Sequence, residues 1–341
     1  MNRLLENEVL NKAIFQGLGI AMNDSSPNTK LPIFVYGALK VNEIAWHQIK
    51  LYVESASEAT LQDYELRVSD GVGFAAPHIE KFVQGFLIKF KSPDIAYEKI
   101  SKFEGVKLNK SRYKWTQVIV SGTPANLLEL RGKLPSYAEA SSWGLHDDEV
   151  FSKGIPWLHD TMKLAIAKLR TVAVPGLKPQ SYWESYFQLQ GCFLFMWGVQ
   201  ERLELFRFGV TDDEKVLGSS GRVVSARSMK ARREEMGRDP LFQDAVRAAN
   251  IDQTLEVRDS RIPTGDSRIS SRNPLSTWYE IRNNITHHAK GSERDIEKLV
   301  IASADNFNAL FHYLRLISPR LAKEWSHWTA IDRRVESSRL C

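Results

Sequence analysis

Short apolar stretches that end at turn-forming residues dominate the first third of the chain. The segment IFVYGALK begins with a β-branched and aromatic run that stops at Gly37, which is the pattern of a buried strand entering a turn. ATLQDYELRV, KFVQGFLIKF and YKWTQVIV have the same strand composition. SPDIAYEKISKF instead starts with a serine cap and a proline at the first helical position, followed by helical apolar spacing. This part of the chain is therefore expected to combine strands with a short helix.

From about Asp147 the apolar spacing becomes helical and strand candidates become few. The pattern predicts a long aromatic helix over 182–208, a short one over 239–249, a polar loop over 258–273 and two final helices over 275–289 and 293–317. The boundary is expected in AVPGLKPQ. The expected parts are a helical extension at 1–30, a mixed α/β domain at 31–172, a linker at 173–180, a helical domain at 181–320 and a tail at 321–341.

Length and composition agree with two packed domains. The chain has 341 residues, of which 43% are hydrophobic and 26% charged, so global disorder is not expected. The first residues, MNRLLENEVLNKAIFQ, indicate a polar amphipathic helix rather than a signal segment, and no uninterrupted apolar stretch is long enough to span a bilayer. Only Cys192 and Cys341 are present, which leaves no disulfide framework or zinc cluster. We expect a cytoplasmic protein without a membrane partner.

Charge adds a local feature to this picture. The net charge of +5 permits an anionic partner without requiring one. Residues 222–290 contain 13 Lys or Arg and 9 Asp or Glu, and most of the basic residues are Arg, the side chain suited to binding phosphate through paired donors. The segments SARSMKARREEMGR and RDSRIPTGDSRISSR could hold an RNA backbone, or they could be exposed polar connections.

Two features of the mixed domain could form a site. A glycine at a strand end lets the backbone approach an anionic ligand, so Tyr36, Gly37, Ala38 and Leu39 could form a cradle for a carboxylate. A carboxylate in a partly apolar cleft has a raised pKa and can serve as a general acid or base, and Glu104 is the candidate. The alternatives are a plain tight turn and a water-exposed carboxylate at a helix end.

FVYGALK, followed downstream by ISKFEGV, resembles the gamma-glutamylcyclotransferase family over roughly residues 31–150. The intervening GFAAPHIEKFVQGFLIKF and the later KSRYKW are similar to the family's middle strands and Tyr-containing stretch. The resemblance implies a small mixed barrel in which Glu104 shuttles a proton while a γ-glutamyl substrate cyclises to 5-oxoproline, without metal or cofactor. Two positions depart from the family pattern: Ala38 replaces a Ser or Thr, and Trp115 replaces an Arg.

The helix expected over 275–289 carries a second candidate site. At 100° per residue, Trp278, Ile281 and Ile285 share an apolar arc. The opposite arc carries Tyr279, Arg282, Asn283, Thr286 and His287. A histidine can move a proton at neutral pH, and a neighbouring arginine can neutralise a phosphate, so Arg282 and His287 suit phosphodiester cleavage without metal. A solvated helix face is the alternative.

The Arg282, Asn283 and His287 pattern resembles the R-x-x-x-x-H motif of the HEPN superfamily, and the match spans about residues 180–320. The stretch from Tyr182 is similar to the family's first helix, with Glu201 at an often acidic position, and SERDIEKLVIASADNFNALFHYLRLI is similar to its last. The resemblance implies a four-helix bundle in which two protomers pair their sites to cut RNA. His287 would be the general base or acid, Arg282 the phosphate stabiliser and Asn283 the orienting residue.

The expected fold class is α+β, a mixed α/β small barrel followed by an all-α four-helix bundle. Our first hypothesis is a homodimeric, metal-independent endoribonuclease of toxin or antiviral-defence type, whose N-terminal domain senses or modifies a small γ-glutamyl-type ligand. The second is a cyclotransferase with a helical domain that only dimerises. The third is a non-enzymatic adaptor. The expected partners are RNA and a second copy of the chain, and the resemblances imply no cofactor or metal.

Overall fold

The computed structural model divides the protein into a unit built on a sheet and a unit built of helices. It describes residues 26–106, 111–171, 179–209, 215–217, 221–223, 226–251, 255, 257–258, 268–269, 274–288 and 293–332. Contacts group 1–149 with 204–232, here called the sheet unit, and 150–203 with 233–341, here called the helical unit. The mixed α/β class with a helical C-terminal region is therefore confirmed. Most of the expected linker, most of the N-terminal extension and the last part of the tail lie outside the described residues.

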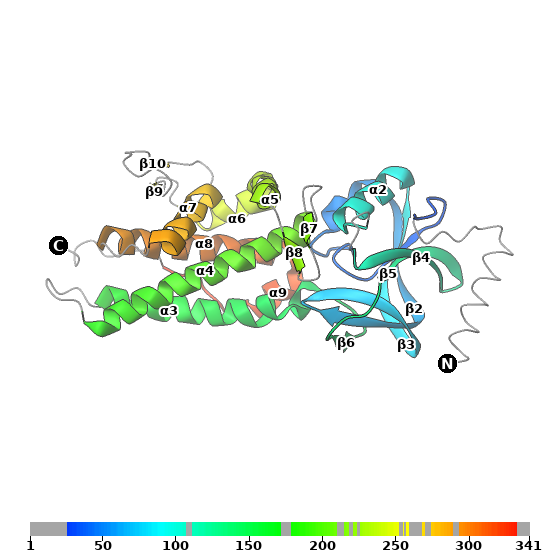
Figure 1. Cartoon of the computed structure of the whole chain (residues 1–341), viewed down its shortest axis with the longest axis horizontal. Helices are drawn as coiled ribbons and strands as arrows, with labels where there is room; N and C mark the ends of the chain where they lie inside the picture. Colours follow the sequence, from blue (N-terminus) through cyan, green and yellow to red (C-terminus); the bar gives the residue numbers. More distant parts are fainter. Residues whose placement is uncertain are drawn as a thin grey trace. The chain divides into compact units, whose positions relative to one another are not determined.

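The sheet unit contains one mixed sheet of six strands, in the order β4-β5-β1-β3-β2-β6 (Figure 1). Its strands are β1 Ile33–Val35, β2 Val53–Ser69, β3 Val72–Phe90, β4 Tyr113–Val120, β5 Thr123–Leu130 and β6 Ala138–Ala140. β1 pairs in parallel with β5 and antiparallel with β3. Beyond the end of β1, β3 pairs directly with β5 at Ala75 and Glu129. The short β1 is thus inserted between two strands that join each other past its end.

The long β2–β3 hairpin turns tightly and then bends. Asp70 and Gly71 form its tip with φ of 52° and 70°, the left-handed backbone that an Asp-Gly pair accepts in a two-residue hairpin loop. Farther along, the register shifts after Gln62, where Asp63 and Glu80 also have positive φ, 58° and 67°. Extra residues at such an irregularity bend a strand away from a flat sheet.

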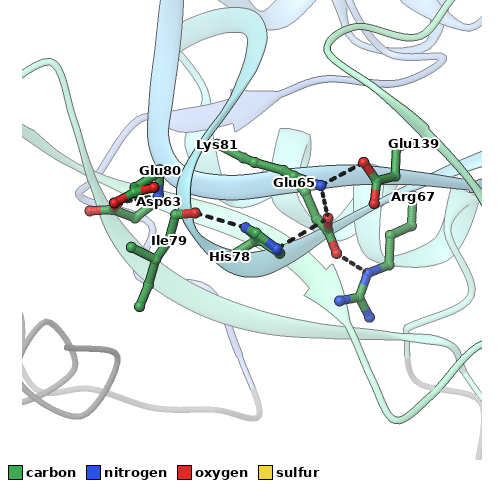
Figure 2. A network of polar contacts seen from close by, with 8 residues as sticks. All are labelled: Asp63, Glu65, Arg67, His78, Ile79, Glu80, Lys81 and Glu139. Atoms are coloured by element: carbon green, nitrogen blue, oxygen red, sulfur yellow. Dashed lines mark hydrogen bonds and ion pairs between the residues drawn. The ribbon is translucent and has the colours of Figure 1, made fainter. Parts of the chain in front are cut away.

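A charged network lies beside this bend (Figure 2). Glu65 is only 2% exposed, and its carboxylate accepts from Arg67 Nε at 2.5 Å and Lys81 Nζ at 2.9 Å. Lys81 also donates to Glu139 of β6. Burial alone would raise the pKa of Glu65, but the hydrogen bonds from Lys81 and Arg67 outweigh burial and hold that pKa below its ordinary value. The network therefore ties both strands of the bent hairpin to β6.

The core of the sheet unit lies under helix α2, Pro93–Phe103. Trp115 is 2% exposed and meets the Tyr97 ring edge-on, with ring centroids 5.6 Å apart. Other buried members of this cluster are Ile33, Val35, Leu39, Ile88, Ile100, Phe103 and Leu128. Short helices η1 Trp46–Gln48, η2 Lys50–Tyr52 and η3 Leu145–Asp147 connect the strands.

Residues 204–232, which follow the sheet in the sequence, also belong to the sheet unit. The last turns of α4, Gln180–Phe208, are fixed by Arg207, whose Nη1 donates to Ile44 O at 2.8 Å. Gly209 ends α4 with φ of 75°, and a Cβ placed on it would lie 2.7 Å from Phe103 O. Only glycine fits this position without displacing α2. The hairpin β7 Lys215–Leu217 and β8 Gly221–Val223 and the first part of α5 Ala226–Arg238 follow.

The described part of the helical unit contains η4 Val150–Gly154, which continues into α3 Ile155–Thr171, most of α4, α6 Pro240–Ala248, α7 Pro274–His288, α8 Glu293–Ile317 and α9 Pro319–Glu324, with the small pair β9 Val257–Arg258 and β10 Arg268–Ile269. The long helices α3, α4 and α8 run lengthwise in Figure 1. The helices expected over 182–208, 239–249, 275–289 and 293–317 are present within two residues of those bounds, and the helix expected at the start of the chain lies outside the described residues. α3 belongs to this unit by its contacts, although it precedes the expected linker. None of the helices in the described ranges is long and apolar enough to cross a membrane.

The segment after α9 folds back onto the helices. The Trp328 ring stacks on His159 of α3 with centroids 5.0 Å apart. Asn308 of α8 holds the backbone of Ile331 at both polar groups, donating to its carbonyl at 2.9 Å and accepting from its N–H at 2.8 Å. Residues 325–332 of the expected tail are therefore part of the packed unit.

Candidate functional site

Arg282 and Asn283 lie side by side on α7, and their side chains are bonded to each other. Arg282 Nη1 donates to Asn283 Oδ1 at 3.1 Å. Asn283 is 7% exposed, whereas Arg282 is half-buried. A buried amide loses rotational freedom, so this bond fixes one nitrogen of the guanidinium and leaves its other donors for a ligand. The orienting role expected for Asn283 stays a prediction.

The arc of α7 that carries Arg282 and Asn283 is packed in part, although Thr286 on the same arc is exposed. The apolar arc is buried as expected, with Trp278 at 2% and Ile281 at 7% exposure. On the other side, the Tyr279 ring lies 5.8 Å from the Trp197 ring of α4. His287 belongs to α7, but its side chain lies outside the described residues. The solvated-face alternative therefore does not describe Asn283 or Tyr279.

Three further residues of the helical unit border this arc, and the sequence pattern did not single them out as site residues. Trp197 Nε1 donates to Glu201 Oε1 at 2.7 Å, which gives the often acidic position a local partner. Arg233 of α5 places its guanidinium 4.0 Å from the centre of the Tyr279 ring and 5.2 Å from that of Trp197. A signal existed in the arginine-rich 225–238 segment, but sequence spacing alone could not show that α5 packs on α7.

In the sheet unit, the Tyr36 hydroxyl joins β3 to β5 at the point where β1 ends. It donates to Leu128 O, and the Ala75 N–H is hydrogen-bonded to it. Burial raises the pKa of this phenol far above its ordinary value; the bond from Ala75 acts in the opposite direction, and the negative charge of Glu104 raises the pKa again. The side chain of Tyr36 is thus engaged with the sheet backbone.

The rest of the expected cradle has mixed exposure. Gly37 faces open space, since a Cβ built on it would meet nothing within 4 Å. Ala38 is half-buried, and its carbonyl accepts from Ala45 N–H at 2.9 Å. Leu39 is 4% exposed and packs in the core. A ligand at this turn would therefore meet Gly37 and Ala38 rather than the side chains of Tyr36 and Leu39.

Glu104 is half-exposed at the C-cap of α2, directly after Phe103, and Gly105 explains the Glu-Gly pair. Gly105 has φ of 62°, and Val106 N–H donates to Ser101 O at 2.9 Å across it. This is the glycine-terminated helix end that satisfies the last carbonyls. The structure brings the Glu104 charge within electrostatic range of Tyr36, so these two expected site residues do lie near each other.

Another carboxylate lies close to the Gly37 turn in sequence, and the sequence reasoning missed it. Burial raises the pKa of Glu43 above its ordinary value, and the nearby charges of Lys40 and His146 lower it in part. The Glu43 N–H donates to Lys40 O at 3.0 Å, so it belongs to the turn that follows Gly37. Raised pKa values of carboxylates cluster at functional sites, so Glu43 is a second candidate beside Glu104 for the proton-transfer role.

Comparisons with known proteins assign no function to the chain. No protein-family model matches the chain. No curated protein matches it. The crystal structure of an uncharacterized protein from Pyrococcus horikoshii is similar at 16% identity and a TM-score of 0.27, and the match covers 36% of this chain and 97% of that one. A match of this kind says nothing about activity.

A buried carboxylate of β5 extends the polar surroundings of Tyr36. Glu129 is 6% exposed, pairs with Lys114 Nζ at 2.7 Å and accepts from the Tyr64 hydroxyl at 2.8 Å. Charged residues inside the apolar strands 113–120 and 123–130 were the signal that the sequence offered. Within the ranges that the structure describes, no group of three His, Cys, Asp or Glu side chains is placed to hold a metal ion.

Proposed function

We propose that the protein is a metal-independent endoribonuclease of the HEPN type that works as a homodimer, with its catalytic residues on α7. The observation that carries the proposal is the bond between Arg282 and the buried Asn283, five and four residues before His287 on the same helix. A guanidinium held in place by a buried amide is preorganised to stabilise developing negative charge. The superfamily's four-helix bundle is part of this proposal, with α4, α7 and α8 as three of its helices.

The reaction follows from the two side chains of each protomer. One His287 takes the proton of a ribose 2′-hydroxyl, whose oxygen attacks the adjacent phosphorus. The bond from phosphorus to the 5′-oxygen breaks, and the second protomer's His287 donates a proton to that oxygen. Arg282 stabilises the charge on the non-bridging phosphate oxygens. The products are a 2′,3′-cyclic phosphate and a 5′-hydroxyl.

The test is incubation of the purified full chain with RNA in EDTA, with analysis of the product ends. Arg282→Ala and His287→Ala should abolish cleavage, whereas His288→Ala, which removes the neighbouring imidazole, should retain it. Wild-type protein that leaves RNA intact, or cleavage that survives in His287→Ala, would refute the proposal.

We propose as a second function that the sheet unit is a gamma-glutamylcyclotransferase with the family's small barrel and that the helical unit only dimerises. The half-exposed Glu104, within electrostatic range of Tyr36, favours it. The substrate's α-amine would attack its γ-carbonyl carbon, the amide bond to the remainder would break, and Glu104 would carry the proton from the attacking amine to the leaving amine. Trp115 is a core residue, so the family's Arg has no counterpart at that position.

Release of 5-oxoproline from γ-glutamyl peptides tests this second function. Glu104→Gln should remove the activity, and Glu98→Gln, on the exposed side of the same helix, should not. Loss in Glu43→Gln with full activity in Glu104→Gln would transfer the proton-shuttle role to Glu43. No release by the wild-type chain would exclude the cyclotransferase.

One feature favours a third function, a non-enzymatic adaptor. α3 and α4 expose large apolar side chains on the helical unit: Trp157 is 54% exposed, Leu164 53%, Phe187 59% and Phe195 39%. Exposed apolar groups gathered on neighbouring helices are typical of protein-binding surfaces. Activity of neither kind in the purified chain, together with self-association that Phe187→Glu weakens, would support an adaptor.

A further inference from the structure

Arg233 lies over two neighbouring aromatic rings of the helical unit, Tyr279 and Trp197. Its guanidinium carbon lies 4.0 Å from the centre of the Tyr279 ring and 5.2 Å from the centre of the Trp197 ring. A guanidinium over an aromatic face gains about 0.5–2 kcal/mol from the ring quadrupole, depending on how dry the contact is. These contacts fix the position of the side chain, and the neutral rings leave its positive charge unpaired.

The charge of Arg233 is not neutralised by a carboxylate within the described part of the chain. Its buried Nε has no hydrogen-bond acceptor within the described residues, and its guanidinium contacts the two rings. By contrast, Arg238 of the same helix pairs with Glu234 at 3.5 Å. A half-buried cation without an anionic partner keeps its full attraction for an incoming anion.

The position of this cation relates it to the proposed site. Tyr279 precedes Arg282 by three residues on α7, so the two side chains are neighbours on the same face of the helix. Tyr279 lies about 4.5 Å from Arg282 along the axis of α7, and the Arg233 guanidinium lies on the Tyr279 ring, so both cations border the same stretch of the helix. Neighbouring phosphates of one RNA strand can reach two cations spaced in this way.

We propose that Arg233 is a second phosphate-binding residue of the α7 site, which holds the phosphodiester next to the one at Arg282. The inference rests on the proposed ribonuclease function. Arg233 contacts the strand and positions it, while Arg282 and His287 act on the scissile phosphate. Trp197 and Tyr279 hold the guanidinium in place before RNA binds, so less conformational freedom is lost on binding.

Salt dependence of binding tests the contact directly. The probe is a single-stranded oligodeoxynucleotide, which lacks the 2′-hydroxyl and is not cleaved. The slope of log K against log salt is negative, and removing one phosphate contact should make it shallower by about 0.7. Arg233→Ala should show this change; so should Arg233→Met, which keeps a long side chain against the two rings. Arg238→Ala, which removes the same charge from an exposed position on the same helix, should not.

Cleavage kinetics with RNA separate the roles of the two arginines. Arg233→Ala should raise KM about tenfold with little change in kcat, because one charge-assisted hydrogen bond is lost from the bound and the transition states alike. Arg233→Lys should recover the salt slope. Arg282→Ala should lower kcat instead.

The possible results distinguish failure of the Arg233 phosphate contact from failure of the ribonuclease proposal. If wild-type protein cleaves RNA in an Arg282-dependent way but Arg233→Ala and Arg233→Met match Arg238→Ala in slope and KM, Arg233 does not bind phosphate and the ribonuclease proposal stands. If the wild-type chain does not cleave RNA, the ribonuclease proposal fails, and an unchanged salt slope in both Arg233 variants would overturn the phosphate contact as well.

Discussion

We expect the hydroxyl of Tyr36 to contribute several kcal/mol to the free energy of unfolding of the sheet unit. Tyr36→Phe removes one oxygen and leaves the ring, so packing is preserved. It takes the acceptor from Ala75 N–H and the donor from Leu128 O, two backbone groups in the interior of the sheet. A buried polar group that loses its partner costs about 1–3 kcal/mol, so the two together predict a loss of about 2–6 kcal/mol.

The same hydroxyl predicts a pH dependence with a definite sign. The pKa of Tyr36 is raised in the folded chain above the ordinary value of about 10, so the folded state holds its proton where the unfolded state has lost it. This contribution is complete below pH 10 and is lost as pH rises further. One proton difference amounts to about 1.4 kcal/mol per pH unit, so at pH 11 the gap between wild type and Tyr36→Phe should narrow by about that amount.

Urea unfolding at pH 7 and pH 11 measures both effects, with Tyr137→Phe as the control because Tyr137 is 43% exposed. Other tyrosines titrate equally in wild type and variant and cancel in the difference. A Tyr36→Phe chain as stable as Tyr137→Phe at pH 7 would refute the bridging role. A stability gap that is the same at both pH values would refute burial of the neutral phenol.

Three other changes test separate parts of the fold. Glu65→Gln should lower the free energy of unfolding by about 1–3 kcal/mol at pH 7 because Lys81 and Arg67 lose their buried anion. Because the Glu65 pKa is lowered in the folded chain, the difference in stability between variant and wild type should disappear as pH falls below about 4. Thermal unfolding at both pH values measures this difference. Gly209→Ala should destabilise the chain by about 2–4 kcal/mol because of its positive φ and its approach to Phe103. Gly198→Ala, within α4, meets nothing within 4 Å and should instead stabilise the chain by up to about 1 kcal/mol. The midpoints of urea unfolding measure both changes. Asn308→Ala should release residues 325–332, since both backbone groups of Ile331 lose their partner, and faster amide hydrogen exchange confined to that segment would be the signature; unchanged exchange there would contradict it.

The helices were predictable from the sequence because their ends carry local signals. Asp239 caps α6 by accepting from Leu241 N–H, and Gly105 and Gly209 end α2 and α4 in the left-handed conformation. Apolar spacing gave the bounds of α7 and α8 because each buries a continuous face. Elements whose ends depend on neighbouring residues were therefore accessible without a structure.

The candidate sites were only partly predictable, since their environment comes from distant segments. That Asn283 is buried rather than solvated depends on how α7 packs in the helical unit, where Trp197 and Arg233 lie against its Tyr279. The engagement of Tyr36 depends on β1 ending after three residues, so that its hydroxyl takes the place of a missing ladder bond between β3 and β5. Neither arrangement has a signature in local spacing.

The contact between His159 and the segment after α9 has a consequence for biosynthesis. The imidazole Nε2 lies 3.1 Å from the carbonyl of Thr329, a residue 170 positions later in the chain. The ribosome must therefore have made the chain as far as Thr329 before α3 can acquire its last neighbours. Until then the ring surface that Trp328 will cover stays open to chaperones and to other nascent chains, so a premature stop codon just ahead of Trp328 would leave that surface permanently bare.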